Sequence, residues 1–191
     1  MINDCFLMQK HFIESRRDGM TIAFQPVMTP QDIELTAKMA DSIWHEYFTP
    51  LIGEAQVAYM LDKFQSASAI TRQIEFENMQ YFRLLQDGTM VGYTGIREDA
   101  DSLFLSKLYI EKSQRGKGLA RQTATFLTDH CHARRLSKIW LTVNRRNSPT
   151  IAAYQKLGFV IVREQAADIG GGFIMDDYIM EMALPLSDKH D

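Results

Sequence analysis

The sequence has few of the residues that build disulfide frameworks and zinc sites. Only two of its 191 residues are cysteines, Cys5 and Cys131, and two thiols cannot form a multi-bridge framework or a four-thiolate zinc site. Disulfide-rich chains are typical of oxidising compartments, so this composition favours a reducing, cytoplasmic location. The cysteine content therefore implies no metal and no covalent scaffold.

The sequence also lacks a large excess of positive charge and a long hydrophobic run. Its 21 Lys and Arg residues against 24 Asp and Glu residues give a net charge of -3, which argues against nucleic-acid binding. The apolar runs are short, whereas a membrane-spanning helix needs about 20 apolar residues. The start of the chain carries Asp4 and does not resemble a signal peptide. We expect a soluble protein without nucleic-acid or membrane partners.

Internal repeats and low-complexity segments are absent, and the predicted loops are short. Hydrophobic residues make up 46% of the chain, which is typical of one globular domain of this length. The pattern predicts a single domain over residues 21–184. Residues 1–20 form an N-terminal extension in this interpretation, and residues 185–191 form a polar tail.

The first half of the domain is predicted to hold helices followed by antiparallel strands. Thr29, Pro30 and Asp32 form a helix start, with a hydroxyl at the N-cap and a carboxylate three residues later. Pro50 is predicted to interrupt this helix. The remaining elements are a strand over 21–27, helices over 54–65 and 70–77, and strands over 80–85, 90–96 and 103–110, the first two of these joined by an Asp87–Gly88 turn.

The second half alternates helices with strands. The expected elements are a helix over 118–135, a strand over 139–143, a helix over 149–157, a strand over 159–163 and a last strand over 173–184, which follows flexible glycines at 170–172. The complete pattern predicts an α/β fold, with a mixed and mostly antiparallel sheet flanked by helices.

The loop over residues 110–120 carries the most informative motif. Gly116 and Gly118 allow backbone N–H groups to turn inward around a phosphate, and the following helix adds the positive end of its dipole. Arg115 and Lys117 supply full positive charges. This composition predicts a cradle for a pyrophosphate.

Two other nucleotide motifs are excluded by spacing. A P-loop requires glycine where Glu111 stands, and Ser or Thr where Gly118 stands. A dinucleotide fingerprint that begins at Gly116 requires Gly or Ala where Arg121 stands.

Residues 115–120 resemble the cofactor loop of the GNAT superfamily of N-acetyltransferases, which reads Gln/Arg, two residues, Gly, one residue and Gly/Ala. The resemblance continues through residues 139–149 and through Tyr154, Gly158 and Phe159, and it covers roughly residues 21–184. It implies the GNAT acyltransferase fold, whose sheet splays at the cofactor site. It also implies direct transfer of the acetyl group of acetyl-CoA to an amine.

The resemblance further implies where the cofactor lies. The pantetheine arm would fill the gap between the strands that end at Ile110 and Val143, bonded to backbone groups as in strand addition. Asn147 would orient this arm, and Tyr154 would protonate the departing thiolate. The cofactor-binding residues would be Leu108, Tyr109, Ile110, Arg115, Gly116, Lys117, Gly118, Leu119, Ala120, Asn147 and Tyr154.

The general base does not follow from the resemblance. Many relatives use a glutamate on the strand before the loop, and Ser106 stands in its place. Ser106 is therefore the second candidate catalytic residue, with a bound water as a relay. Asp176, Asp177 and Glu46 are the alternative carboxylates.

Trp44, Glu46, Tyr47 and Asp177 are the candidate acceptor-binding residues. Aromatic rings with a carboxylate suit a cationic amine, although Trp44 and Phe48 equally fit the core face of their helix. Residues 43–48 and 173–181 resemble the bacterial polyamine-acetylating branch. This likeness favours a small primary amine or a polyamine as acceptor.

Three alternatives stay open from the sequence. An acyl-CoA sensor without turnover agrees with the missing glutamate. A protein lysine or N-terminal acetyltransferase would have a shallow, open acceptor groove. Exchange of the last strand or pairing of sheet edges would give a homodimer.

Overall fold

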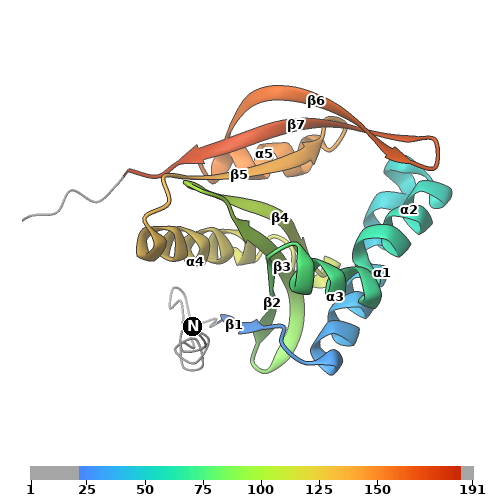
Figure 1. Ribbon diagram of the computed structural model, residues 1–191, viewed down its shortest axis with the longest axis horizontal. Helices are drawn as coiled ribbons and strands as arrows, with labels where there is room; N and C mark the ends of the chain where they lie inside the picture. Colours follow the sequence, from blue (N-terminus) through green and yellow to red (C-terminus); the bar gives the residue numbers. More distant parts are fainter. Residues whose placement is uncertain (1–21, 186–191) are drawn as a thin grey trace, which may run out of the picture.

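The structure is a computed structural model that describes residues 22–185 (Figure 1). The extension predicted over residues 1–20 lies outside the described residues, as does most of the tail predicted over 185–191. The strands are β1 (Ile22–Pro26), β2 (Met79–Gln86), β3 (Thr89–Glu98), β4 (Ser102–Ile110), β5 (Lys138–Asn144), β6 (Val160–Gly170) and β7 (Phe173–Ala183). The helices are α1 (Pro30–Ile52), α2 (Glu54–Met60), the π-helical η2 (Leu61–Gln65), α3 (Ala67–Phe76), the 3₁₀ turn η3 (Lys112–Gln114), α4 (Leu119–Arg134) and α5 (Ser148–Lys156).

The strands form one seven-stranded sheet in the order β1-β2-β3-β4-β5-β7-β6. Every neighbouring pair is antiparallel except β4 and β5. The prediction of three antiparallel neighbours is confirmed for β2, β3 and β4, and the mixed α/β sheet is confirmed as well. The Asp87–Gly88 turn has positive φ at both residues, which is the geometry of a tight two-residue hairpin.

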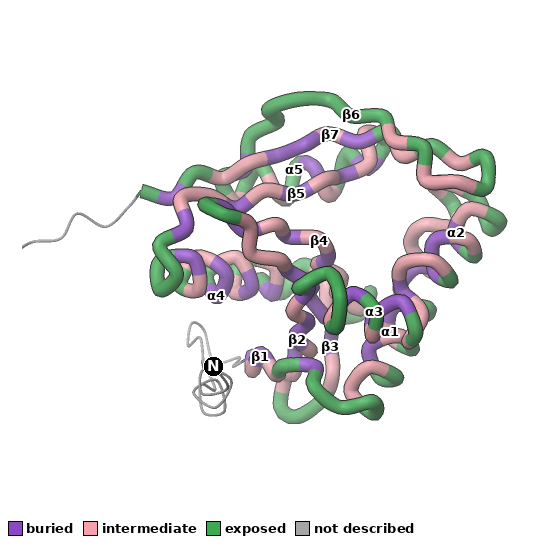
Figure 2. Tube along the Cα trace, in the orientation of Figure 1, coloured by how far each residue is buried: buried purple, intermediate pink, exposed green. Residues whose placement is uncertain are grey.

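The helices cover the two faces of this sheet and enclose two hydrophobic cores (Figure 2). On one face, α4 and α5 pack with Leu127 and Ile151 against the strands. Cys131 is fully buried in this core, as predicted, and burial raises the pKa of its thiol to about 12. On the other face, α1, α2, η2 and α3 form the second core, in which Trp44 and Ile70 are buried.

Helix α1 begins as predicted but is longer than predicted. The Thr29 hydroxyl accepts a bond from the Asp32 amide at 3.1 Å, and the Asp32 carboxylate accepts one from the Thr29 amide at 3.0 Å. The predicted interruption at Pro50 is wrong, because the helix continues to Ile52. Proline removes one N–H bond, but the Gly53 amide still donates to Thr49 at 3.0 Å, so the last turn closes.

Strand β6 also runs further than predicted. It extends from Val160 to Gly170, so the glycines at 170–172, predicted as a flexible link, instead form the turn of the β6–β7 hairpin. The turn packs against α2: the Tyr59 hydroxyl donates to the Ile169 carbonyl at 2.6 Å. A Cβ on Gly171 would lie 2.9 Å from the Tyr59 ring, so the close approach requires glycine.

The described part of the chain holds no helix that is long and apolar enough to cross a bilayer. Within residues 22–185, no group of three or more His, Cys, Asp or Glu side chains is arranged to hold a metal ion.

Candidate functional site

The site begins where the sheet opens between β4 and β5. These parallel strands pair only from Ser102 to Phe104 of β4, opposite Lys138 to Trp140 of β5. Beyond these pairs the two strands diverge, while β4 stays paired with β3 as far as Ile110. The backbone of residues 108–110 therefore lacks a strand partner on its β5 side, as the resemblance implied.

The loop that follows β4 bonds the amides of Glu111, Gln114 and Arg115 within the protein, whereas residues 116–120 follow as a glycine-containing turn into α4. Gly116 and Gly118 have φ values of 78° and 81°, and a Cβ at either position would meet nothing within 4 Å. Glycine is needed here for its backbone conformation alone. Gly118 is the N-cap of α4, and no side chain caps the helix. The free N–H groups of Leu119 and Ala120 are therefore available to an anion.

Arg115 is held between this loop and helix α1. Its Nε donates to the Ile110 carbonyl at 3.0 Å, and its Nη2 donates to Glu46 Oε2 at 2.6 Å. The other Glu46 oxygen lies 3.3 Å from Lys112 Nζ. The hydrogen bond from Arg115 lowers the pKa of Glu46 most, although partial burial acts in the opposite direction. Glu46, predicted to bind the acceptor, thus contacts the loop over residues 110–120.

Tyr47 and Asn147 connect helix α1 to the start of α5. The Asn147 carboxamide oxygen caps α5 through the Thr150 amide at 3.4 Å, and it accepts the Tyr47 hydroxyl at 2.8 Å. The Tyr47 ring also lies 4.9 Å from the Arg115 guanidinium. The candidate cofactor residues Arg115 and Asn147, from different loops, therefore contact adjacent residues of α1.

Tyr154 lies on α5, where its half-buried ring packs edge-on against Phe159 at 5.4 Å. Burial raises the pKa of the Tyr154 phenol, so it is neutral and carries its proton at physiological pH. Burial also raises the pKa of Tyr109, and electrostatic interactions with Tyr154 and Asp177 raise it further. These three side chains therefore lie within electrostatic reach of one another.

Asp177 is a buried acid on β7, opposite Asn144 of β5. Its exposed fraction is 5%, and no hydrogen bond or ion pair within residues 22–185 involves its carboxylate. Burial, with a smaller contribution from Asp176, raises the pKa of Asp177 to about 6. An acid without a partner in such a position is typical of a functional site.

Ser106 and Trp44 occupy different environments. Ser106 is the extra residue of a bulge, since Gly95 pairs with Lys107 and Ile96 pairs with Leu105. Trp44 is 4% exposed and packs between Phe48 and Tyr109, with ring centroids 4.4 and 5.7 Å away. Its indole therefore belongs to the helical core, and its contact with an acceptor stays a prediction.

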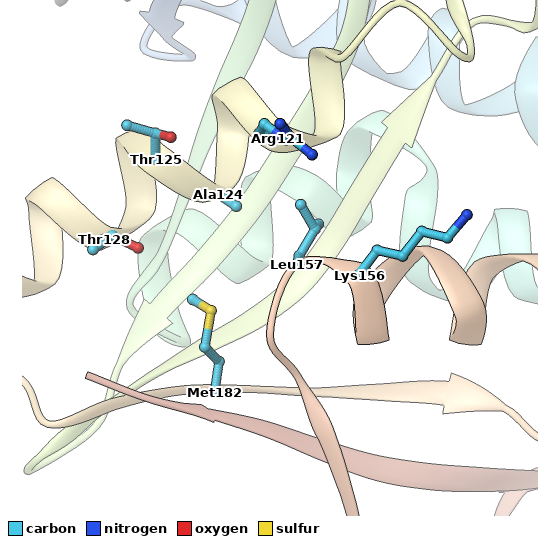
Figure 3. A pocket seen from close by; sticks show the side chains of 7 residues that line it. All are labelled: Arg121, Ala124, Thr125, Thr128, Lys156, Leu157 and Met182. Carbon is cyan, nitrogen blue, oxygen red and sulfur yellow. The ribbon is translucent and has the colours of Figure 1, made fainter. Parts of the chain in front are cut away.

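A groove of about 280 Å³ lies between α4 and α5 (Figure 3). Arg121 of α4 and Lys156 of α5 line it with positive charge, and Met182 of β7 contributes to its floor. The sequence reasoning did not identify this groove. The available signal was a basic residue at each cofactor motif, Arg121 directly after Ala120 and Lys156 two positions after Tyr154.

The arrangement combines a glycine turn at a helix N-terminus, a strand edge without a strand partner and a neutral phenol. Comparisons with known proteins agree with this geometry. A model of the Acetyltransferase (GNAT) family matches residues 38–159. The chain is 30% identical over 108 residues to the [ribosomal protein bS18]-alanine N-acetyltransferase of Escherichia coli, covering 56% of this chain and 71% of that protein.

A second curated relative is streptothricin acetyltransferase of Streptomyces lavendulae. It is 26% identical over 101 residues, which are 52% of this chain and 53% of that protein, so the match spans about half its length. A solved structure of PaiA N-acetyltransferase from Thermoplasma acidophilum with coenzyme A shares the fold. Its TM-score is 0.70 at 19% identity, over 86% of this chain and all of that one. Since the family model matches more than half of the chain, the protein belongs to the GNAT family of acetyltransferases.

Proposed function

We propose that the protein transfers an acetyl group from acetyl-CoA to a primary amine. The diphosphate would lie on the amides of residues 116–120, and Lys117 and Arg115 would contribute charge. The pantetheine arm would bond to the free edge of residues 108–110. The adenosine end would follow the basic groove between α4 and α5, where Arg121 and Lys156 suit its phosphate.

The single observation that carries this proposal is the divergence of β4 from β5 after Phe104. An interior strand edge without a partner would be costly unless a ligand or water satisfied it. The glycine turn proposed to bind the diphosphate follows this edge in the chain. Tyr154 of α5 is close enough to Tyr109 of the same edge to interact with it electrostatically. A thioester with a phosphorylated arm matches both features at once.

Tyr154 would act as the general acid. When the amine attacks the acetyl carbonyl, the C–S bond breaks and a thiolate leaves. Because the raised pKa keeps the Tyr154 phenol protonated at neutral pH, it can donate to this sulfur. Ser106, on the strand edge at the bulge, would face the acceptor nitrogen.

We propose a small primary amine or a polyamine as the acceptor. Asp177 supports this choice, because a buried carboxylate without a partner favours a cationic ligand. Tyr47 and Trp44 would add aromatic surface. Glu46 would join them only after the diphosphate has displaced Arg115 from its carboxylate.

A second candidate is the N-terminal amine of a protein, which the similarity to a ribosomal-protein alanine N-acetyltransferase favours. The contact between the β6–β7 turn and α2 argues for the smaller acceptor. Tyr59 and Lys63 both donate to the Ile169 carbonyl, so this hairpin is fixed against the helical layer. An extended peptide would need space on that side.

The test is a thermal-shift titration with CoA and acetyl-CoA, followed by an acceptor panel monitored through release of the CoA thiol. Saturation at about 100 times Kd would stabilise the fold by about 2.7 kcal/mol, a shift of several degrees. The panel contains spermidine, spermine, putrescine, free lysine and a peptide that begins with alanine. Turnover of the polyamines supports the proposal, and turnover of the peptide alone supports the second candidate. Binding without thiol release from any acceptor would identify an acyl-CoA sensor.

A further inference from the structure

Lys107 is a buried lysine beside the open end of the sheet. Its exposed fraction is 7%, and its Nζ donates to Gln73 Oε1 at 3.0 Å and to Ser106 Oγ at 3.1 Å. No carboxylate of residues 22–185 forms an ion pair with it. Lysine is almost never buried in this way without a charged partner, so the position requires a specific explanation.

The bulge at Ser106 aims Lys107 at the acceptor side. Leu103 and Leu105 face the core under α4, whereas Tyr109 packs against the core under α1. One extra residue shifts the alternation, so Lys107 follows Tyr109 onto the α1 side. The lysine and the proposed acceptor aromatics therefore share one face of β4.

The surroundings of the amine are built to receive it. A Cβ on Gly95 would lie 3.3 Å from Lys107 Cδ and 3.2 Å from Tyr81 Cε1, so glycine makes room for the lysine stem. The Tyr81 ring lies 5.2 Å from Nζ, and its hydroxyl donates to the same Gln73 oxygen as Lys107. The amine is thus held by β2, β3 and α3, with one hydrogen bond aimed at Ser106.

Burial makes the cationic form of Lys107 less stable than in water, so this lysine loses its proton at a lower pH than an exposed one. Burial lowers the pKa of Lys107 to about 8, and the charge of Glu77 opposes this shift only in part. The other ionisable groups on this face are the phenols of Tyr81, Tyr93 and Tyr109, whose pKa values burial raises. They stay uncharged near neutral pH, so the cationic lysine gains the contact with the Tyr81 ring but no anionic phenol beside it.

We propose that Lys107, acting through the Ser106 hydroxyl, takes up the proton that the acceptor amine must lose before it attacks; this inference rests on the proposed function. The neutral Lys107 amine would accept a hydrogen bond from the Ser106 hydroxyl, and the protonated Lys107 amine donates one to it. Lys107 would thus serve as the general base in place of the strand glutamate that many relatives use and this chain lacks.

The proton balance of the step is complete. The acceptor ammonium gives a proton to the Ser106 oxygen while the Ser106 O–H passes its own to Lys107 Nζ. The freed lone pair forms the C–N bond, the C–S bond breaks, and the thiolate takes a proton from Tyr154. The new amide nitrogen returns its second proton to the Tyr154 oxygen, and Lys107 releases its proton to water.

The test compares pH profiles of kcat, at saturating putrescine and glycinamide, for the wild type and Lys107→Met. We expect the wild-type rate to rise with an inflection near pH 8 that is the same for both acceptors. Lys107→Met should lose about 100-fold at pH 8 together with this inflection. Lys107→Arg should lose as much, because arginine stays protonated. Lys38→Met, an exposed change on α1, is the charge-matched control.

Further variants separate a proton relay from a structural role. Ser106→Ala should lose the inflection, and Ser106→Thr should keep it, because the hydroxyl is retained. A CoA-induced thermal shift in every variant verifies that it is folded and binds cofactor. If Lys107→Met is active and keeps the inflection, the role of Lys107 is overturned while the proposed function stands. The same holds if Asp177→Asn loses the inflection and the Lys107 and Ser106 variants keep it. Absence of thiol release from the wild type with every amine overturns the proposed function and this inference together.

Discussion

Glu46 of α1 and Arg115 of the cofactor loop are joined by a hydrogen bond of 2.6 Å between Oε2 and Nη2. Lys112 approaches the second carboxylate oxygen at 3.3 Å. Arg115 and Lys112, which flank the proposed diphosphate site, are therefore already partly neutralised by Glu46 of α1. A diphosphate bound at the proposed site would compete with Glu46 for the same guanidinium, so CoA binding would be coupled to the contacts of α1.

Glu46→Gln is expected to strengthen CoA binding by roughly 1.5-fold to fivefold, because a partly exposed ion pair of this kind contributes about 0.2–1 kcal/mol. Isothermal titration calorimetry with CoA measures the change. Glu34→Gln removes the same charge from an exposed position of α1 and should leave the affinity unaltered. Weaker binding in Glu46→Gln would show instead that the carboxylate organises the loop.

Tyr154→Phe is expected to lower kcat by about 100-fold to 1000-fold, because it removes the proton donor for the thiolate. The Kd for CoA should stay within about twofold, since the ring packing against Phe159 is retained. Steady-state kinetics with the best acceptor of the panel provides the measurement. Tyr178→Phe on β7 is the control for loss of a phenol. An undiminished kcat would exclude Tyr154 as the acid.

Asp177→Asn is expected to stabilise the fold at pH 7 while raising the KM of the acceptor. The folded-state pKa of about 6 lies above the ordinary aspartate value of 3.8, so the folded protein binds more protons than the unfolded chain between these pH values. Stability therefore falls as the pH rises through this window, and the charged acid costs about 1–3 kcal/mol above it.

Urea denaturation at pH 3.5 and pH 7 tests this sign. The gain from Asp177→Asn should appear at pH 7 and vanish at pH 3.5, where the native carboxyl is protonated. Asp176→Asn, at the exposed neighbouring position, should show a much smaller gain, because Asp176 contributes less than burial to the shift and its own contact with Arg145 is lost. Equal stabilities of Asp177→Asn and wild type at pH 7 would contradict the assigned burial cost.

Gly118→Ala is expected to weaken CoA binding by about tenfold and to reduce stability by about 1–2 kcal/mol. The new Cβ has space, so the cost comes from the positive φ of 81° that an alanine avoids. Gly172→Ala is a matched control, because its φ is 80° and its surroundings are equally open. Thermal unfolding should show a similar loss for both variants, and calorimetry should show weaker CoA binding only for Gly118→Ala.

Features set by short sequence distances were predictable. The Thr29 cap, the Asp87–Gly88 turn and the alternation of helix and strand depend on neighbours a few residues apart, and the structure confirms each. The two cofactor motifs combine fixed spacing with their place between a strand and a helix. That combination was enough to predict the family and the open end of the sheet.

Features set by tertiary contacts were not predictable. The pairing of Glu46 with Arg115 joins residues on separate elements, and no pattern within either segment indicates it. The bulge at Ser106 is a one-residue register shift, which reverses the face of Lys107 without a glycine or proline to mark it. The length of β6 depends on pairing with β7, and Pro50 stays helical because the following amides still find partners.

The bond from the Tyr47 hydroxyl to Asn147 has a consequence for altering selectivity. Grafting α1 from another enzyme to obtain a new acceptor would also remove the hydroxyl that positions Asn147 and the carboxylate that engages Arg115. Such a graft would weaken the binding of acetyl-CoA as well as change the acceptor that the protein prefers. Redesign of this protein should therefore vary the helix around positions 46 and 47 while leaving both side chains in place.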